Sequence, residues 1–305
     1  MIGVVAAQQI TVLRRQRTAL AVVLVLVGVT ALAGVIGWSS AATITRVYDQ
    51  SVLLLAAQGR PAPPNPLGLR APLSPLSNMT VYVPMVGALA AIVVGHLSLS
   101  DDQSSGVARL LHSRLLTRRD YLLGKLAAVT GLLAAALVAS LVVAVVSLLG
   151  VNAVVPDSSQ LLRLGTFYLL SLLYLVVFAL VAMVAVLLTR RRSMALLSAL
   201  GAWLVVTFVV PQFISGLSPT ASLNPLSVPV GTSQTFFDIT SRVRFISLSE
   251  VFKNAGAQML ATAQPEPEYL VLGRVAPLLV TALALAGAAL VLVRRHDYSR
   301  SAADE

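Results

Sequence analysis

The charged side chains best able to form specific contacts gather in one short segment, residues 101–125. It reads D-D-Q-S-S-G-V-A-R-L-L-H-S-R-L-L-T-R-R-D-Y-L-L-G-K, with two acidic residues at its start and a lysine at its end. Carboxylates, guanidinium groups and ammonium groups form ion pairs and charge-assisted hydrogen bonds. The segment therefore indicates a contact element within the chain or toward a partner.

Patterns that would carry catalysis or metal binding are missing from the sequence. The chain has no cysteine, which excludes thiol nucleophiles, thiolate metal sites and disulfides. It contains no G-x-S-x-G, no H-E-x-x-H and no G-x-x-x-x-G-K-[ST], and its Gly124-Lys125 pair is followed by Leu126. We therefore expect a non-catalytic chain without a metal, a cofactor or a nucleotide site of its own.

Six long apolar runs are the elements that must position segment 101–125. The chain of 305 residues is 57% hydrophobic and 11% charged, a composition that excludes a soluble globular enzyme. A helix needs about 20 apolar residues to cross a membrane. We predict an all-α polytopic membrane protein with a single transmembrane domain over 1–305. Its predicted spans are 19–38, 81–99, 126–149, 164–188, 194–214 and 275–293.

The distribution of Lys and Arg predicts the orientation of these spans. Most of the 22 basic residues fall in short clusters that flank alternate spans, at 14–17, 109–125, 190–192 and 294–300. Cytoplasmic flanks retain positive charge, so we predict that both termini are cytoplasmic and that the protein is a multi-pass protein of the plasma (inner) membrane. Because topology explains the net charge of +10, we expect no nucleic-acid partner.

Two long outer loops are predicted, over residues 39–80 and 215–273. Prolines concentrated in 60–77 exclude a regular helix there, which indicates an extended cap or linker. In the second loop, Ser249–Leu260 predicts a short amphipathic helix on the outer membrane surface, with Ser249 as its cap. Its predicted apolar face consists of Val251, Phe252, Ala255 and Met259.

Prolines also interrupt two of the predicted spans. Pro84 and Pro211 each lack the backbone N–H that an α-helix needs, so both predict bends. Such a bend can be static or can belong to a moving element, and a static bend is the simpler expectation.

Segment 101–125 has its own internal pattern. Asp101 and Asp102 are expected to precede a helix lying along the membrane, near the positive end of its dipole. Thr117 and Asp120 predict a cap for the following helix, and Lys125 predicts the point at which that helix enters the membrane, with its ammonium snorkelling to water. The apolar face expected for the helix along the membrane contains Val107, Leu110, Leu111 and Leu115.

This segment resembles the loop after the second span of ABC-2 type transporter permeases. In that family an acidic residue, a Gly four positions later, a Leu pair, a Ser/Thr-Arg pair and a terminal Gly-Lys recur. The matching residues here are Asp102, Gly106, Leu110, Leu111, Thr117, Arg118, Gly124 and Lys125. The family commonly has Pro before the Ser/Thr-Arg pair, whereas this chain has Leu115. Residues 72–77 further resemble the subgroup that includes permeases of copper-enzyme maturation transporters.

The resemblance implies an ABC-2 exporter-like permease in which segment 101–125, here named the coupling segment, seats on a cytoplasmic ATPase. Two permeases, either two copies or two related chains, would join two ATPases that hold ATP and Mg. Membrane lipid and an extracytoplasmic binding protein are further expected partners. The residues implied in coupling are Asp101, Asp102, Gly106, Arg109, Arg114, Thr117, Arg118, Arg119 and Lys125.

Other functions stay open at this stage. A non-transporting membrane scaffold would assemble an extracytoplasmic partner through the outer loops. A membrane enzyme would use polar residues of the second outer loop, namely Asp238, Arg242, Arg244 and Glu250. The sequence leaves undecided the substrate, the transport direction, the choice between homodimer and heterodimer, and the role of residues 215–273.

Overall fold

A computed structural model describes residues 2–65, 71–104, 117–152, 154–189, 191–211, 246–260 and 268–295. In these ranges the regular elements are helices. Six helical segments are long and apolar enough to cross a membrane, and each overlaps one predicted span, so the all-α, six-span prediction is confirmed. These segments are Thr18–Ala57, Ser74–Asp102, Arg118–Gly150, Ser158–Leu188, Arg192–Val209 and Val275–Arg294.

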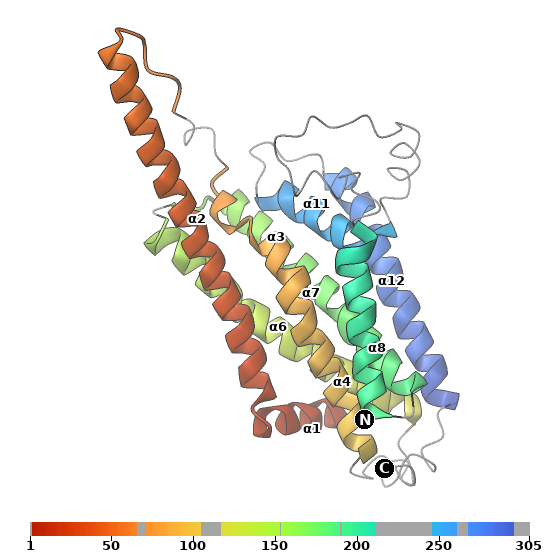
Figure 1. Cartoon of the computed structure of the whole chain (residues 1–305). Helices are drawn as coiled ribbons and strands as arrows, with labels where there is room; N and C mark the ends of the chain where they lie inside the picture. The colour runs from red at the N-terminus through yellow and green to blue at the C-terminus, as the bar shows by residue number, and fades with distance from the viewer. Residues whose placement is uncertain are drawn as a thin grey trace, which may run out of the picture.

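The spanning helices run side by side as one bundle, with α1 and the end of α12 at the same end (Figure 1). The main helices are α2 (Thr18–Ala57), α4 (Ala88–Ser104), α6 (Arg118–Gly150), α7 (Ser158–Leu188), α8 (Arg192–Leu204) and α12 (Glu268–Arg295). Helix α7 is the central one, in contact with α4, α6, α8 and α12. Gly95 of α4 permits a close approach to α7, because a Cβ there would lie 2.4 Å from the Ala179 carbonyl oxygen.

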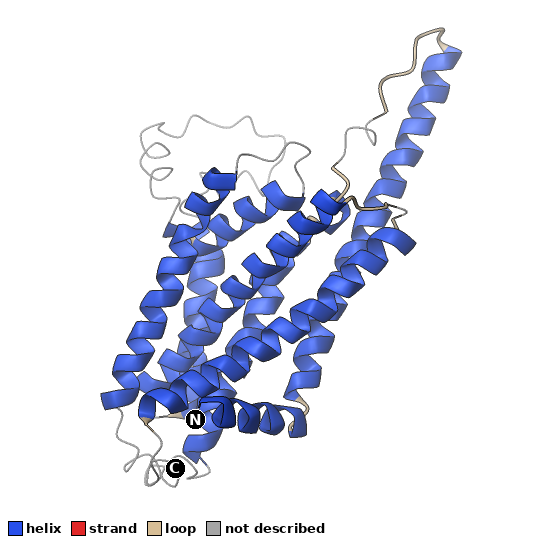
Figure 2. Ribbon diagram, turned by 180° about the vertical axis from the view of Figure 1, so that it is seen from behind, coloured by secondary structure: helices blue, strands red, loops and turns tan. Residues whose placement is uncertain are grey.

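An additional helix, α1 (Ile2–Arg15), lies across the base of the bundle against α6 (Figures 1 and 2). Its buried residues Val5, Gln9 and Leu13 follow the spacing of one helix face. The chain then turns sharply at Arg17, whose φ of 61° is left-handed, and Thr18 donates a hydrogen bond to the Leu13 carbonyl. The sequence prediction missed α1 because its basic end was interpreted only as the flank of the first span.

Helix α2 is twice as long as its predicted span. The prediction of an outer loop over 39–80 is wrong for residues 39–57, which continue α2 beyond the rest of the bundle (Figure 1). The stretch between Gly37 and Gly59 contains no Gly or Pro, so nothing local ends the helix. It ends where Gly59 adopts a φ of 69° and the Arg60 N–H bonds the Leu55 carbonyl. The described proline-rich residues that follow are not α-helical, as predicted.

The two prolines that predict bends lie in or close to widened, π-helical turns near the outer end of the bundle. The second span begins with η2 (Ser74–Leu76) and α3 (Met79–Tyr82) and then contains the π turn η3 (Val83–Gly87), which includes Pro84. Helix α8 continues into the π turn η4 (Val205–Val209), two residues before Pro211. A π turn accommodates a residue that interrupts the regular α-helical hydrogen-bond ladder.

The predicted amphipathic helix is present as α11 (Leu248–Leu260), and its predicted apolar face is buried. The face packs into the outer end of the bundle and does not rest on its surface, since Phe252 is fully buried and its ring lies 4.7 Å from that of Tyr174 in α7. The cap prediction is wrong by two residues. Ser247 accepts from the Glu250 N–H at 3.4 Å, whereas Ser249 donates to another helix.

Candidate functional site

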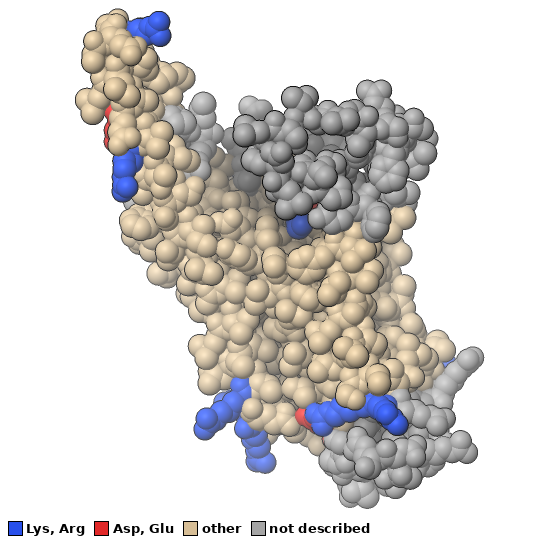
Figure 3. All heavy atoms as spheres, viewed as in Figure 1, with Lys and Arg blue, Asp and Glu red and all other residues tan. Residues whose placement is uncertain are grey.

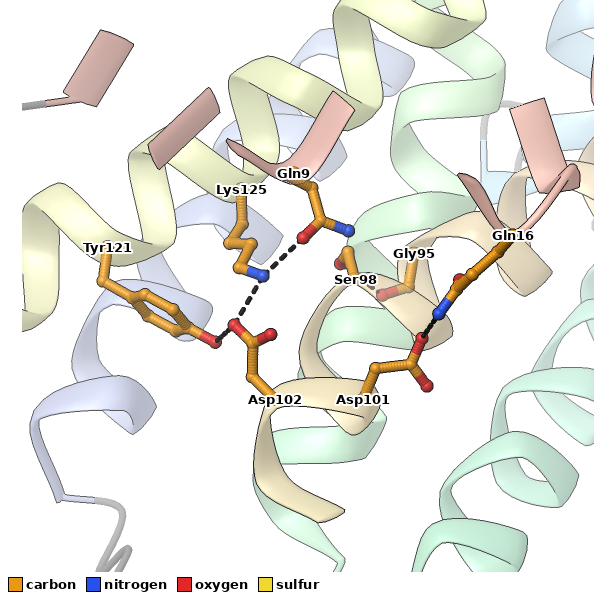
Figure 4. A network of polar contacts seen from close by, with 8 residues as sticks. All are labelled: Gln9, Gln16, Gly95, Ser98, Asp101, Asp102, Tyr121 and Lys125. Atoms are coloured by element: carbon orange, nitrogen blue, oxygen red, sulfur yellow. Dashed lines mark hydrogen bonds and ion pairs between the residues drawn. The ribbon is translucent and has the colours of Figure 1, made fainter. Parts of the chain in front are cut away.

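The two ends of the coupling segment are joined to each other inside the protein. Asp102 lies in the last turn of α4, and Lys125 lies in the second turn of α6. Their Oδ2 and Nζ atoms are 2.5 Å apart, and the Tyr121 hydroxyl donates to the same Asp102 oxygen at 2.8 Å (Figure 4). Residues 105–116, including Gly106, Arg109 and Arg114, lie outside the described residues.

This ion pair is largely withdrawn from solvent. The side chain of Lys125 is 6% exposed and that of Asp102 is 16% exposed. A buried pair of charges is tolerated when further hydrogen bonds satisfy both groups. Here the Lys125 ammonium also donates to Gln9 Oε1 at 2.5 Å. The prediction that Lys125 snorkels to water is therefore wrong, because its charge is satisfied within the bundle.

Helix α1 and the turn that follows it supply polar partners near both aspartates. Gln9, which is buried in the face that α1 turns toward α6, reaches Lys125. In the turn that follows α1, Gln16 Nε2 donates to Asp101 Oδ2 at 3.0 Å (Figure 4). Close packing of α1 on α6 depends on Gly124, because a Cβ at that position would lie 2.6 Å from the Val5 Cβ.

The remaining contacts extend the site to α8 and α12. Asp101 forms an ion pair with Arg192 in the first turn of α8. At the start of α6, Thr117 Oγ1 accepts from the Asp120 N–H at 3.1 Å, which confirms the predicted role of Thr117 as a cap. Arg118 donates to the Arg294 carbonyl at 2.6 Å, so its cation lies at the C-terminal end of α12.

We name this set the basal cluster, and it contains Gln9, Gln16, Asp101, Asp102, Tyr121, Lys125 and Arg192. Three sequence-predicted residues belong to it: Asp101, Asp102 and Lys125. The aspartates lie within α4 and are paired to other helices. The helix that they are predicted to precede falls in residues 105–116, outside the described residues. Arg119 is exposed at the start of α6.

Sequence reasoning missed the partners of these residues. Tyr121 lies inside the coupling segment but has no distinguishing sequence pattern, and Arg192 is one of three basic residues that flank a span. Gln9 lies on the same face of α1 as Val5 and Leu13, whereas Gln16 lies in the turn that follows the helix. A glutamine inside an otherwise apolar stripe was the one available signal for a buried polar partner.

The basal cluster consists of ion pairs and hydrogen bonds that hold helices together. Its groups are an ion pair, hydrogen-bond donors and amides, without an identifiable nucleophile–base pair. Within the described ranges, no three His, Cys, Asp or Glu side chains gather closely enough to hold a metal ion. The cluster joins α1, α4, α6 and α8 at one end of the bundle.

Comparison with known proteins identifies the molecule at the level of a family. Residues 4–297 match the family described as ABC-2 family transporter protein, which covers nearly the whole chain. No curated protein matches the sequence. The match agrees with the six apolar helices and with the motif that bounds the coupling segment. The chain belongs to the ABC-2 family of transporter proteins and is a multi-pass permease component of membrane transport.

Proposed function

We propose that this chain is the permease subunit of an ATP-driven exporter in the plasma membrane, and that separate cytoplasmic ATPases act on it through residues 101–125. The observation that carries the proposal is the closed base of the coupling segment. Asp102 and Lys125 tie the segment's two ends together, and Asp101 ties them to α8. A displacement of the segment would therefore move several helices together, because both of its ends are fixed to each other and to α8.

Exposed basic side chains at the same end of the bundle support a docking face for the ATPases. On the face seen in Figure 3, Lys and Arg occur toward the two ends, and the middle carries uncharged residues. A cytoplasmic position for this end follows from the positive-inside rule. Among the described residues, the exposed arginines at the base are Arg14, Arg15, Arg17, Arg118, Arg119, Arg191, Arg192 and Arg294.

The proposed assembly contains two permeases and two ATPases. ATP and Mg would be bound by the ATPases, and this chain would contribute neither a catalytic residue nor a cofactor site. The second permease would be another copy or a related chain, with membrane lipid around both. An extracytoplasmic binding protein would meet the opposite end, where α2 extends beyond the bundle.

The test reverses the charge at the start of α6. We expect Arg118→Glu/Arg119→Glu to reduce ATPase co-purification and permease-dependent stimulation of ATP hydrolysis severalfold, since both side chains belong to the coupling segment and are exposed. The matched control is Arg46→Glu, because Arg46 is also exposed but lies on the outer part of α2, away from the coupling segment. Assembly and stimulation equal to those of the unchanged protein would refute the coupling role.

A non-transporting scaffold is the second candidate, and one observation favours it. The outer part of α2 exposes Val47, Leu53 and Leu54 beyond the bundle, and apolar side chains in such a position suit a protein partner. A scaffold would still assemble its partner when the ATPase is inactivated. A transporter would lose its cellular function under that condition.

A further inference from the structure

Two π turns from different spans lie toward the outer end of the bundle. In η3 the Ala88 N–H bonds the Val83 carbonyl, and in η4 the Val210 N–H bonds the Val205 carbonyl. Both are five-residue steps in place of the usual four. Single π turns inside α-helices are frequent at functional sites.

Each π turn also receives a side-chain hydrogen bond from another element, at an equivalent position. In η3, the next residue after Val83 is Pro84, whose carbonyl accepts from Trp203 Nε1 at 2.9 Å. In η4, the next residue after Val205 is Val206, whose carbonyl accepts from Ser249 Oγ at 3.1 Å. The donor to η3 lies just before η4, and the donor to η4 lies at the start of α11.

These bonds connect three elements in series: η3, η4 and the start of α11. Ser249 is fully buried, so the alternative of bonding to water is remote in the closed arrangement. The Trp203 ring additionally packs edge-on against Phe208 of η4, with centroids 5.4 Å apart. The two turns therefore share their supporting contacts, and loss of one bond should loosen the other turn.

We propose that η3, η4 and the start of α11 form a hinge at the outer end of the bundle, held in its bonded state by Trp203 and Ser249. Conversion of a π turn to an α turn changes the register by one residue, equivalent to about 100° of rotation and about 1.5 Å of rise. Opening would therefore re-orient the outer ends of two spans together. The hinge proposal is based on these contacts alone, and its test does not depend on the ATPase-coupling proposal.

The chain's tryptophan content allows a direct test, because it has two tryptophans. Trp203 reports on the hinge, whereas Trp38 lies half exposed on α2. We suggest expressing the chain with 5-fluorotryptophan, purifying it into lipid nanodiscs and recording fluorine NMR spectra. Trp38→Phe would assign the two resonances. The expected spectrum has a major Trp203 resonance and a minor one from the open state, while Trp38 gives no response to hinge variants.

Removing the bond on the far side of η4 should change the Trp203 populations. We expect Ser249→Ala to raise the ratio of the open to the bonded resonance about fivefold, the factor that corresponds to one ordinary hydrogen bond. The matched control is Ser198→Ala, because Ser198 donates only to the nearby Ala195 carbonyl of its own helix. A single Trp203 resonance that Ser249→Ala leaves unchanged would overturn the hinge.

Hydrogen exchange provides the reciprocal measurement from the other bond. Trp203→Phe retains a ring but removes the donor to Pro84. Exchange should accelerate about fivefold in both 83–88 and 205–210, with no change in Trp38→Phe. Acceleration confined to one of these two segments would show that the turns open independently, which contradicts the proposal.

Discussion

The Lys125 ammonium is almost completely enclosed by the bundle, and its charge is balanced by the Asp102 carboxylate. We expect Lys125→Met to destabilise the protein by about 3 kcal/mol, because removal of one partner leaves a poorly solvated carboxylate. Reversible unfolding in detergent, followed by helical circular dichroism, would measure the loss.

Two variants make the interpretation of this loss specific. Asp102→Asn/Lys125→Met removes both charges and should recover a large part of the lost stability. Lys253→Met breaks an ion pair of 3.5 Å within α11, with a more exposed ammonium, and should cost less than about 1 kcal/mol. Equal losses for Lys125→Met and Lys253→Met would contradict a special role for the buried pair.

At the residue scale, the sequence predicted which positions matter better than it predicted their contacts. The spacing of Asp102 and Lys125 singled out both residues, and Thr117 was identified correctly as a helix cap. That the aspartate pairs with the lysine depends on two antiparallel helices lying side by side and on a third helix crossing them. Such long-range geometry leaves no local pattern, which is why Gln9 and Arg192 were missed.

The packing of α1 on α6 depends on the absence of a side chain at Gly124. We expect Gly124→Ala to destabilise the protein by about 1–3 kcal/mol, because its Cβ would overlap Val5 and push α1 outward. Thermal unfolding in detergent would measure the effect. Increased proteolysis near Arg17 would report the displacement of α1 directly.

Gly131 gives a control in the same helix. A Cβ there would meet nothing within 4 Å, so Gly131→Ala should be neutral or stabilising by up to about 1 kcal/mol through helix propensity. If both substitutions changed stability alike, the tight contact between α1 and α6 would be refuted.

At the scale of elements, apolar runs predicted the membrane helices well because burial in lipid and the sequence pattern report the same quantity. The ends of those helices were predicted less well. Hydropathy falls after Trp38, where polar and charged residues begin. Helix α2 nevertheless continues to Ala57, and Gly59 follows its end. Helix α11 was predicted by its periodicity, but a periodic apolar face fits a membrane surface and a bundle equally well.

For the molecule as a whole, the orientation in the membrane is the prediction on which the proposed function depends. Because the chain has no cysteine, single cysteines can be introduced without a background. We expect an impermeant maleimide applied to intact cells to label Gln50→Cys, on the outer part of α2. Arg15→Cys, at the base, should react only after the membrane is permeabilised.

These two positions are both exposed, so accessibility on the correct side is the variable measured. Labelling of Arg15→Cys in intact cells, with Gln50→Cys protected, would place the coupling segment outside the cell. No cytoplasmic ATPase could then reach it, and the proposed function would be wrong.

The unbroken length of α2 has a geometric consequence for the whole molecule. Its 40 residues form a rod of about 60 Å, jointed at Arg17 to the crosswise helix α1. If the rod pivots there by about 10°, its far tip sweeps through about 10 Å, whereas the midpoint moves about half as far. A small adjustment at the base of the bundle is thus enlarged into a displacement the width of a helix at the opposite tip.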